Sequence, residues 1–218
     1  MPLSSSEAAQ YCQDLYNGAG HFDVFSGCVT DHVYVGCKVS DQHVTIVFRG
    51  STTPIDWIRD FRFCMVDRPG VGRVEDGFYD GIPRVFNDLH SLLAARKVFI
   101  VGHSLGAARA LLFAGLLGFK QYAVSGVIVF GCPNPAGMTL KLLLQDARMP
   151  IWAYENHADP FLRVPVALPR VPYQKPYTAA QTVRIAQKPA ALDLWGPFAP
   201  HHMELYQAGA VSDYRTIN

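Results

Sequence analysis

Short apolar runs alternate with longer amphipathic or apolar stretches along most of this chain. The short runs are rich in β-branched residues and end at polar or turn-forming residues, a pattern that predicts strands. These predicted strands cover residues 29–39, 44–48, 97–101, 123–130, 151–154 and 182–186. The longer stretches predict helices over residues 7–17, 77–96, 107–117, 138–146 and 202–210. Irregular chain is expected over residues 50–71, with one short helix near 56–63, and over most of the proline-rich stretch 159–200.

This alternation of strands and helices indicates the fold class. Parallel strands need long crossover connections, which helices usually provide, and those helices then cover both faces of the sheet. We therefore predict an α/β protein with a central, mostly parallel sheet flanked by helices. The chain has 218 residues without a long linker or an internal repeat, so we expect a single domain over residues 1–218.

A candidate nucleophile lies between the predicted strand 97–101 and the predicted helix 107–117. The segment reads Gly102-His103-Ser104-Leu105-Gly106, which is a G-x-S-x-G pattern. Strand, G-x-S-x-G and helix in this order form the nucleophile elbow of α/β-hydrolases, in which the glycines permit a sharp turn around an exposed serine. The order of elements along the chain also matches an α/β-hydrolase core.

A serine hydrolase of this fold needs an acid and then a histidine after the serine. Asp159 follows the predicted strand 151–154, where a loop at the carboxyl end of the sheet is expected. His157 is too close to Asp159 in sequence to act as the base, whereas His201 and His202 open the last predicted helix. We prefer His201 as the base and keep His202 as the alternative. The backbone N–H of Leu105, after the nucleophile, is expected to donate to the oxyanion.

Composition narrows the classes of partner. The formal net charge is +1, so nothing suggests nucleic acid, and no apolar run is long enough to predict a transmembrane segment. Five scattered cysteines lack the spacing of a zinc site, and no metal or cofactor is expected. Residues 1–7 do not resemble a signal peptide, which indicates a cytoplasmic protein, or an exported one whose signal was removed before the numbered chain.

Five segments resemble motifs of the class 3 lipases, the fungal-lipase-like α/β-hydrolases, in the same order along the chain. The first is the strand end Phe48-Arg49-Gly50-Ser51, with Trp57 downstream, and the second is Asp76-Gly77-Phe78. The others are Phe130-Gly131-Cys132-Pro133, the acid loop Asn156–Pro165, and His201 with Tyr206 five residues later. Together they span about residues 40–207.

This resemblance implies roles for individual residues. It assigns Ser104 as nucleophile, Asp159 as acid, His201 as base and Ser51 as the second oxyanion residue. It further implies a carboxylic-ester hydrolase acting on acyl esters, with acylglycerols favoured, and transient contact with a lipid interface is left open. A phospholipase A1-type or aromatic-ester esterase on the same site, a peptidase, and a non-catalytic lipid-binding module are the alternatives.

Two features of the substrate site are left open by the sequence. Residues 53–66 form either a small lid or a fixed loop, with Trp57, Ile58, Phe61 and Phe63 as the apolar face. An acyl pocket is expected from apolar residues in the loops near the candidate site. These residues are Phe161, Leu162, Val164, Val166, Leu168, Leu194, Trp195 and Phe198.

Overall fold

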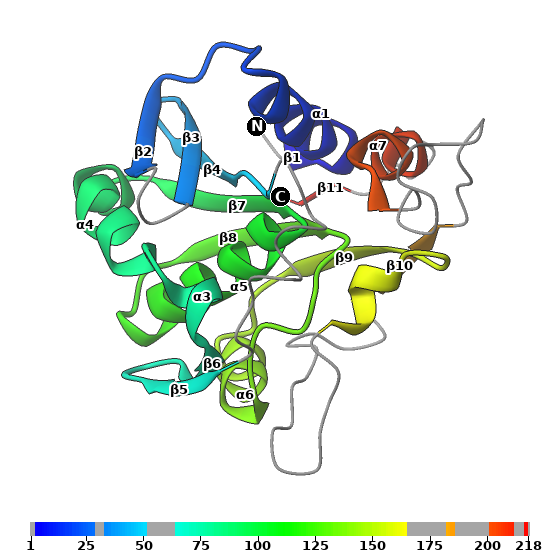
Figure 1. Ribbon diagram of the computed structural model, residues 1–218. Coiled ribbons are helices and arrows are strands. Elements are labelled where there is room, and N and C mark those ends of the chain that lie inside the picture. The colour runs from blue at the N-terminus through cyan, green and yellow to red at the C-terminus, as the bar shows by residue number, and fades with distance from the viewer. Residues whose placement is uncertain are drawn as a thin grey trace.

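A seven-stranded sheet forms the centre of the protein in the computed structural model (Figure 1). The structure describes residues 3–28, 33–51, 64–164, 182–185, 201–211 and 216–217. In spatial order the strands are β10 (Thr182–Ile185), β9 (Ile151–Asn156), β8 (Val124–Phe130), β7 (Lys97–His103), β4 (His43–Phe48), β3 (Val33–Val39) and β2 (Val24–Cys28). The first five are parallel, and β3 and β2 are antiparallel to their neighbours. The predicted α/β class with a mostly parallel sheet is confirmed.

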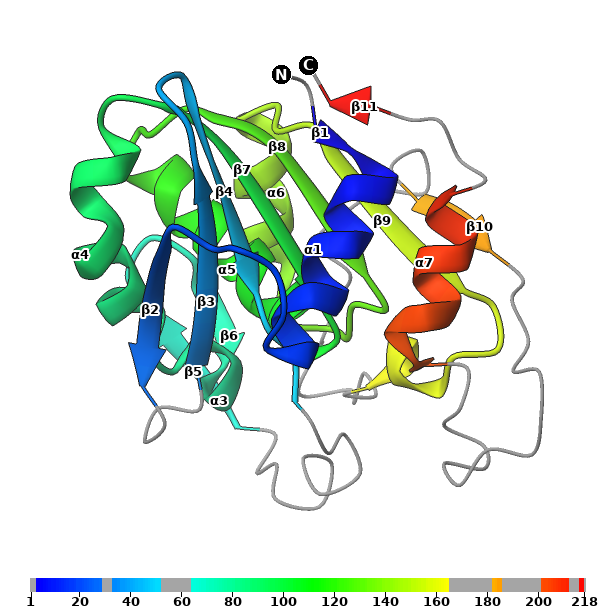
Figure 2. The same cartoon turned by 90° about the horizontal axis from the view of Figure 1, so that it is seen from above.

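Helices cover both faces of this sheet (Figure 2). On one face lie α3 (Asp76–Tyr79), α4 (Ile82–Leu93), α5 (Leu105–Phe119) and α6 (Met138–Asp146). On the other face lie α1 (Ser5–Asn17) and α7 (Met203–Val211). α5 is buried over almost its whole length, which explains why its sequence is apolar all round rather than amphipathic.

The two helices α1 and α7 pack against each other although they lie at opposite ends of the chain. α1 begins with a capping box between Ser4 and Glu7 and ends at Gly18, whose φ of 63° suits glycine. Gln207 of α7 donates to the side chain of Gln10 on α1 at 2.6 Å. The strands β1 (Leu3–Ser4) and β11 (Thr216–Ile217) also pair, so both chain ends lie together (Figure 2). These contacts fix the start of α7, where the candidate bases lie.

The structure differs from the predicted elements at several places. The prediction of one continuous helix over 77–96 is wrong, because Gly81 adopts a φ of 75° and α4 starts anew with Pro83 in its first turn. The strand β2 was not predicted. Within the region 50–71 expected to be irregular, β5 (Met65–Arg68) forms a hairpin with β6 (Gly72–Glu75), which was not predicted either. The predicted short helix near 56–63, and residues 53–63 of the proposed lid, lie outside the described residues.

Glu75, at the end of β6, is a buried carboxyl that caps α3. Its side chain accepts a hydrogen bond from the N–H of Phe78 at 2.8 Å, and only 1% of the residue is exposed. Burial raises the pKa of Glu75 from 4.5 to about 7, although backbone N–H donors oppose the shift. The folded state therefore holds a proton at a pH where the unfolded chain has released it.

We expect Glu75→Gln to flatten the pH dependence of stability between pH 5 and 8. Below pH 4.5 the Glu75 carboxyl is protonated in both states, and from there to about pH 7 the wild type loses up to about 3 kcal/mol as the unfolded state ionises first. Glutamine cannot ionise, yet it keeps an oxygen for the Phe78 N–H. Urea unfolding at pH 5 and pH 8 measures this difference. Asp67→Asn, at an exposed position on β5, is the control, and equal pH slopes for wild type and Glu75→Gln would contradict the prediction.

Candidate active site

The chain turns sharply at Ser104, between β7 and α5. Ser104 has a φ of 58° and a ψ of −128°, a strained conformation for a residue with a side chain. A Cβ on Gly102 would lie 2.3 Å from the carbonyl oxygen of Gly106, and a Cβ on Gly106 would lie 2.1 Å from that of Phe48. Both glycines are therefore required by close backbone approach. This geometry is the one expected of a nucleophile elbow.

Three residues far apart in sequence form a hydrogen-bonded chain beside this turn. The Oγ of Ser104 lies 2.7 Å from Nε2 of His201, and Nδ1 of His201 lies 2.6 Å from Oδ2 of Asp159. At most 3% of each residue is exposed. An ionised carboxylate accepts hydrogen bonds and donates none, so Nδ1 of His201 donates to Oδ2 of Asp159. In the neutral ring that carries its hydrogen on Nδ1, Nε2 accepts the hydrogen bond from Ser104.

The parallel sheet explains why these residues meet. β7, β8 and β9 are neighbours in the sheet, and Ser104 and Asp159 both follow the carboxyl ends of their strands. His201 lies just before α7, which packs against β9 and α1. Gly131, after β8, leaves room between them, since a Cβ there would lie 3.1 Å from atoms of Asp159, His201 and Tyr206.

Tyr206 is a part of this cluster to which the sequence assigned no role. Its hydroxyl donates to Oδ2 of Asp159 at 2.5 Å and accepts from the N–H of Asn156 at 3.1 Å. Burial, reinforced by the charge of Asp159, raises the pKa of Tyr206 well above its ordinary value, so the hydroxyl keeps its hydrogen. The signal in the sequence that could have found Tyr206 was its position as the last residue of the His-x-x-x-x-Tyr segment that begins at His201.

Phe161 holds both the acid and the candidate base. Its backbone N–H donates to Oδ1 of Asp159 at 2.8 Å, because Asp159 caps the short 3₁₀-helix Pro160–Arg163. Its ring stacks on the ring of His201 with centroids 4.0 Å apart. Together with Tyr206, Phe161 fixes the orientation of the Asp159 carboxylate and restricts rotation of the imidazole.

The predicted oxyanion residues lie on two segments that meet at Ser104. Leu105 is the first residue of α5, where backbone N–H groups have no acceptor within the helix. The positive end of the helix dipole lies at the same place. On the other segment, a Cβ on Gly50 would lie 3.0 Å from Cβ of Ser104. Ser51, half-buried, follows Gly50 directly. Leu105 therefore neighbours Ser104 in sequence, and Ser51 follows a residue, Gly50, that packs against Ser104.

The other two histidines considered from the sequence lie elsewhere. His202 is half-buried and precedes α7 directly, while both ring nitrogens of its neighbour His201 are used by Ser104 and Asp159. His157 is exposed, and its backbone N–H donates to the carbonyl of Ile185. The geometry favours His201 over His202 as the base.

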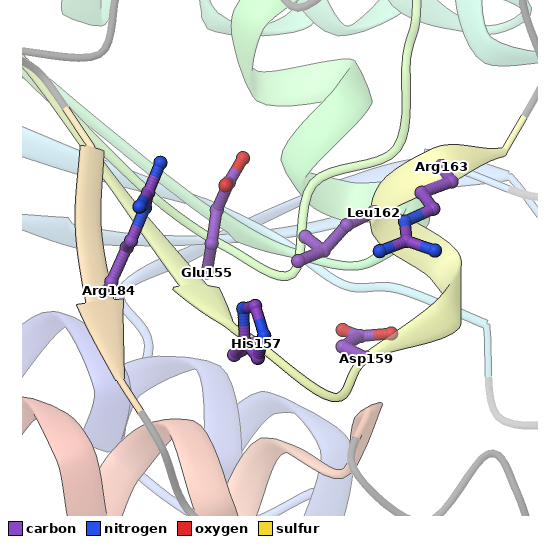
Figure 3. A pocket seen from close by; sticks show the side chains of 6 residues that line it. All are labelled: Glu155, His157, Asp159, Leu162, Arg163 and Arg184. Carbon is purple, nitrogen blue, oxygen red and sulfur yellow. The ribbon is translucent and has the colours of Figure 1, made fainter.

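A cavity of about 260 Å³ opens beside Asp159 (Figure 3). The described residues that line it are Glu155, His157, Asp159, Leu162, Arg163 and Arg184. Neither Ser104 nor His201 is among these lining residues, whereas Leu162 is one of the residues predicted for the acyl pocket. The predicted pocket residues Val166, Leu168, Leu194, Trp195 and Phe198 lie outside the described residues, and that pocket stays a prediction.

The described residues provide information on two kinds of partner, metal ions and membranes. Within them, no group of three or more His, Cys, Asp or Glu side chains is arranged to hold a metal ion. Among the helices that the structure describes, none is both long and apolar enough to cross a membrane.

Fold and site together define an α/β-hydrolase with a buried Ser-His-Asp arrangement at the carboxyl edge of its sheet. Comparison with known proteins identifies the family: the model for "Lipase (class 3)" matches residues 45–168, more than half of the chain. The chain belongs to the class 3 lipases.

Individual relatives agree with this family. A lipase of Rhizomucor miehei is 39% identical over a stretch that covers 34% of this chain and 23% of that protein, so the match spans about a quarter of the curated relative. The solved structure of the triacylglyceride lipase of Rhizomucor miehei has a TM-score of 0.63 at 24% identity, covering 75% of this chain and 72% of that chain. Lipase II of Rhizopus niveus has a TM-score of 0.62 at 23% identity, covering 74% and 72%. These two structural matches support the fold, and none of the comparisons supports a cytoplasmic location.

Proposed function

We propose that this protein is a serine carboxylic-ester hydrolase that works through an acyl-enzyme. The observation that carries the proposal is the buried chain of hydrogen bonds from Ser104 Oγ through His201 to Asp159. Membership of the class 3 lipases supports the same reaction. A strained serine that donates to an imidazole oriented by a carboxylate is the arrangement that activates a hydroxyl nucleophile.

The first half of the reaction forms the acyl-enzyme. Nε2 of His201 takes the hydrogen of Ser104 as Oγ attacks the ester carbonyl carbon, and the carbonyl oxygen becomes an oxyanion. The N–H groups of Ser51 and Leu105 stabilise this oxyanion, each contributing about 3 kcal/mol by analogy with other oxyanion donors. His201 then gives its hydrogen to the leaving alkoxide, and the alcohol departs.

The second half releases the acid. A water molecule gives a hydrogen to Nε2 of His201 and attacks the acyl carbon, and collapse of the second oxyanion returns the hydrogen to Ser104. During both halves, Asp159 stabilises the imidazolium through Nδ1–H and keeps the ring in one tautomer. Tyr206 and Phe161 hold the Asp159 carboxylate in place through the hydrogen bonds to its two oxygens.

Acylglycerols are the substrate class we propose. The relative from Rhizomucor miehei is described as a triacylglyceride lipase, and the family match supports a lipid ester here. Transient contact with a lipid surface belongs to the same proposal. Phospholipids and aromatic esters carry the same carbonyl chemistry, and they are therefore outcomes that the experiment distinguishes.

We expect the protein to hydrolyse a series of p-nitrophenyl esters from acetate to palmitate, and to release fatty acid from tributyrin and triolein emulsions. The test compares these rates with those on phosphatidylcholine, methyl ferulate and a p-nitroanilide. Highest rates on the acylglycerols support the proposal, and highest rates on phosphatidylcholine or methyl ferulate overturn the substrate class. Failure to cleave any ester would overturn the hydrolase itself and favour a lipid-binding module, while cleavage of the anilide alone would indicate a peptidase.

A further inference from the structure

A second histidine, His103, lies beside the candidate base and belongs to the same turn as Ser104. It is 4% exposed, and its ring centroid is 4.9 Å from that of His201. Its Nε2 lies 2.9 Å from the backbone carbonyl oxygen of His201, and its Nδ1 lies 2.9 Å from the hydroxyl of Tyr16 on α1. A buried chain of hydrogen bonds therefore runs from the first helix to the backbone of His201.

The direction of each hydrogen bond in this chain follows from the chemistry of its groups. A carbonyl oxygen only accepts, so Nε2 of His103 carries the hydrogen and donates to His201. Burial lowers the pKa of His103 well below 6.5, and protonation of His201 would lower it further, so the His103 ring is neutral and Nδ1 is an acceptor. The hydroxyl of Tyr16 must then donate to Nδ1.

The oxygen of Tyr16 also lies against the backbone of Gly50. The contact is close, since a Cβ on Gly50 would lie 2.1 Å from that oxygen and 2.6 Å from the carbonyl oxygen of His103. Only glycine fits at this point. The hydroxyl of Tyr16 thus joins the backbone before Ser51 to the ring before Ser104.

We propose that Tyr16 and His103 are positioning residues that hold the oxyanion segment and the base in register with Ser104. The chain of contacts runs from the backbone of Gly50 through the Tyr16 hydroxyl and the His103 ring to the His201 carbonyl. It touches none of the reacting atoms, and it connects the two segments that must converge on them. The inference rests on the proposed function, because it assigns the base to His201 and the oxyanion to Ser51.

Loss of the Tyr16 hydroxyl is expected to lower the rate rather than to weaken substrate binding. Without the Tyr16 hydroxyl, Nδ1 of His103 loses its hydrogen-bond donor and Gly50 loses the atom that packs against it, so both segments can shift. A displacement of about 1 Å between reacting groups can lower the rate by about 100-fold. We expect Tyr16→Phe to lower kcat by about 10-fold to 100-fold and to change KM by about twofold at most.

The control variant for this test is Tyr11→Phe, which removes the same atom from the same helix. The ring of Tyr11 lies 5.6 Å from Nζ of Lys38 on β3. The measurement is kcat and KM on a soluble p-nitrophenyl ester, with kcat expressed per Ser104 that reacts with a fluorophosphonate. That normalisation removes any loss from misfolded protein.

Two variants of His103 test the direction of the hydrogen bonds. His103→Gln can place an amide N–H where Nε2 donates, so the hydrogen bond to the carbonyl of His201 survives. His103→Asn can place an oxygen where Nδ1 accepts, so the partner of Tyr16 survives and the His201 carbonyl loses its donor. We expect His103→Gln to keep about 10-fold more of kcat than His103→Asn, and the downfield proton resonance of His201 Nδ1–H to shift only in His103→Asn.

The outcomes separate the inference from the proposed function. A wild type that cleaves no ester overturns the proposed function, and the inference with it. An active wild type with equal kcat values in Tyr16→Phe and Tyr11→Phe overturns the inference alone. Equal losses of kcat in His103→Gln and His103→Asn, with an unchanged His201 resonance in both, would likewise overturn it, because the ring would then act only by filling space.

Discussion

Ser104→Ala is expected to lower kcat on p-nitrophenyl esters by about 10⁴-fold or more. Alanine cannot be acylated, and the oxyanion donors that remain accelerate attack by water only weakly. The backbone conformation at φ 58° is equally strained for serine and alanine, so the fold should tolerate the change. The activity is measured together with the melting temperature, which we expect to stay within about 3 °C of the wild type.

The control for this variant is Ser91→Ala, at an exposed position on α4, which should retain full activity. Labelling of the wild type by a fluorophosphonate, and its loss in Ser104→Ala, provides a second readout. Full activity in Ser104→Ala would place the nucleophile elsewhere and overturn the proposed mechanism.

The second large effect is expected at the adjacent histidines. His201→Ala should lower kcat by about 10³-fold or more, because Ser104 loses the acceptor for its hydrogen. It should also lower the stability, since Oδ2 of the buried Asp159 then keeps only the Tyr206 hydroxyl. His202→Ala, one position further along, is the matched control and should retain most of the activity. A loss confined to His202→Ala would reverse the assignment of the base.

Much of the fold could be predicted because parallel strands and buried helices leave strong local patterns. β7 and β8 are apolar along nearly their whole length because both of their faces are covered. The strands missed were β1, β2, β5, β6 and β11, whose short and partly polar sequences become strands only by pairing with a neighbour. The helix break at Gly81 was missed because the apolar positions of a helix continue through it. The left-handed φ of Gly81 is what separates α3 from α4.

The candidate site divides in the same way. The glycines around Ser104 and the acid loop at Asp159 have local sequence patterns, so both positions could be proposed before any geometry was known. The doublet His201-His202 left two candidate bases, with His201 preferred from its resemblance to the family's last segment, and the packing of α7 against α1 and β9 orients the ring of His201 toward Ser104. Packing between distant segments made that choice.

Sequence alone determined the class of the protein, the turn that carries Ser104 and the short set of residues from which an acid and a base can come. These features depend on interactions between residues near each other in the chain, which composition and spacing record. Only the tertiary structure decided which histidine contacts Ser104, and that Tyr16, His103 and Tyr206 hold the site together. Tyr16 is 87 residues from His103, and Tyr206 is 47 residues from Asp159. Hydrogen bonds across such separations follow from how helices and strands pack, and no local pattern encodes them.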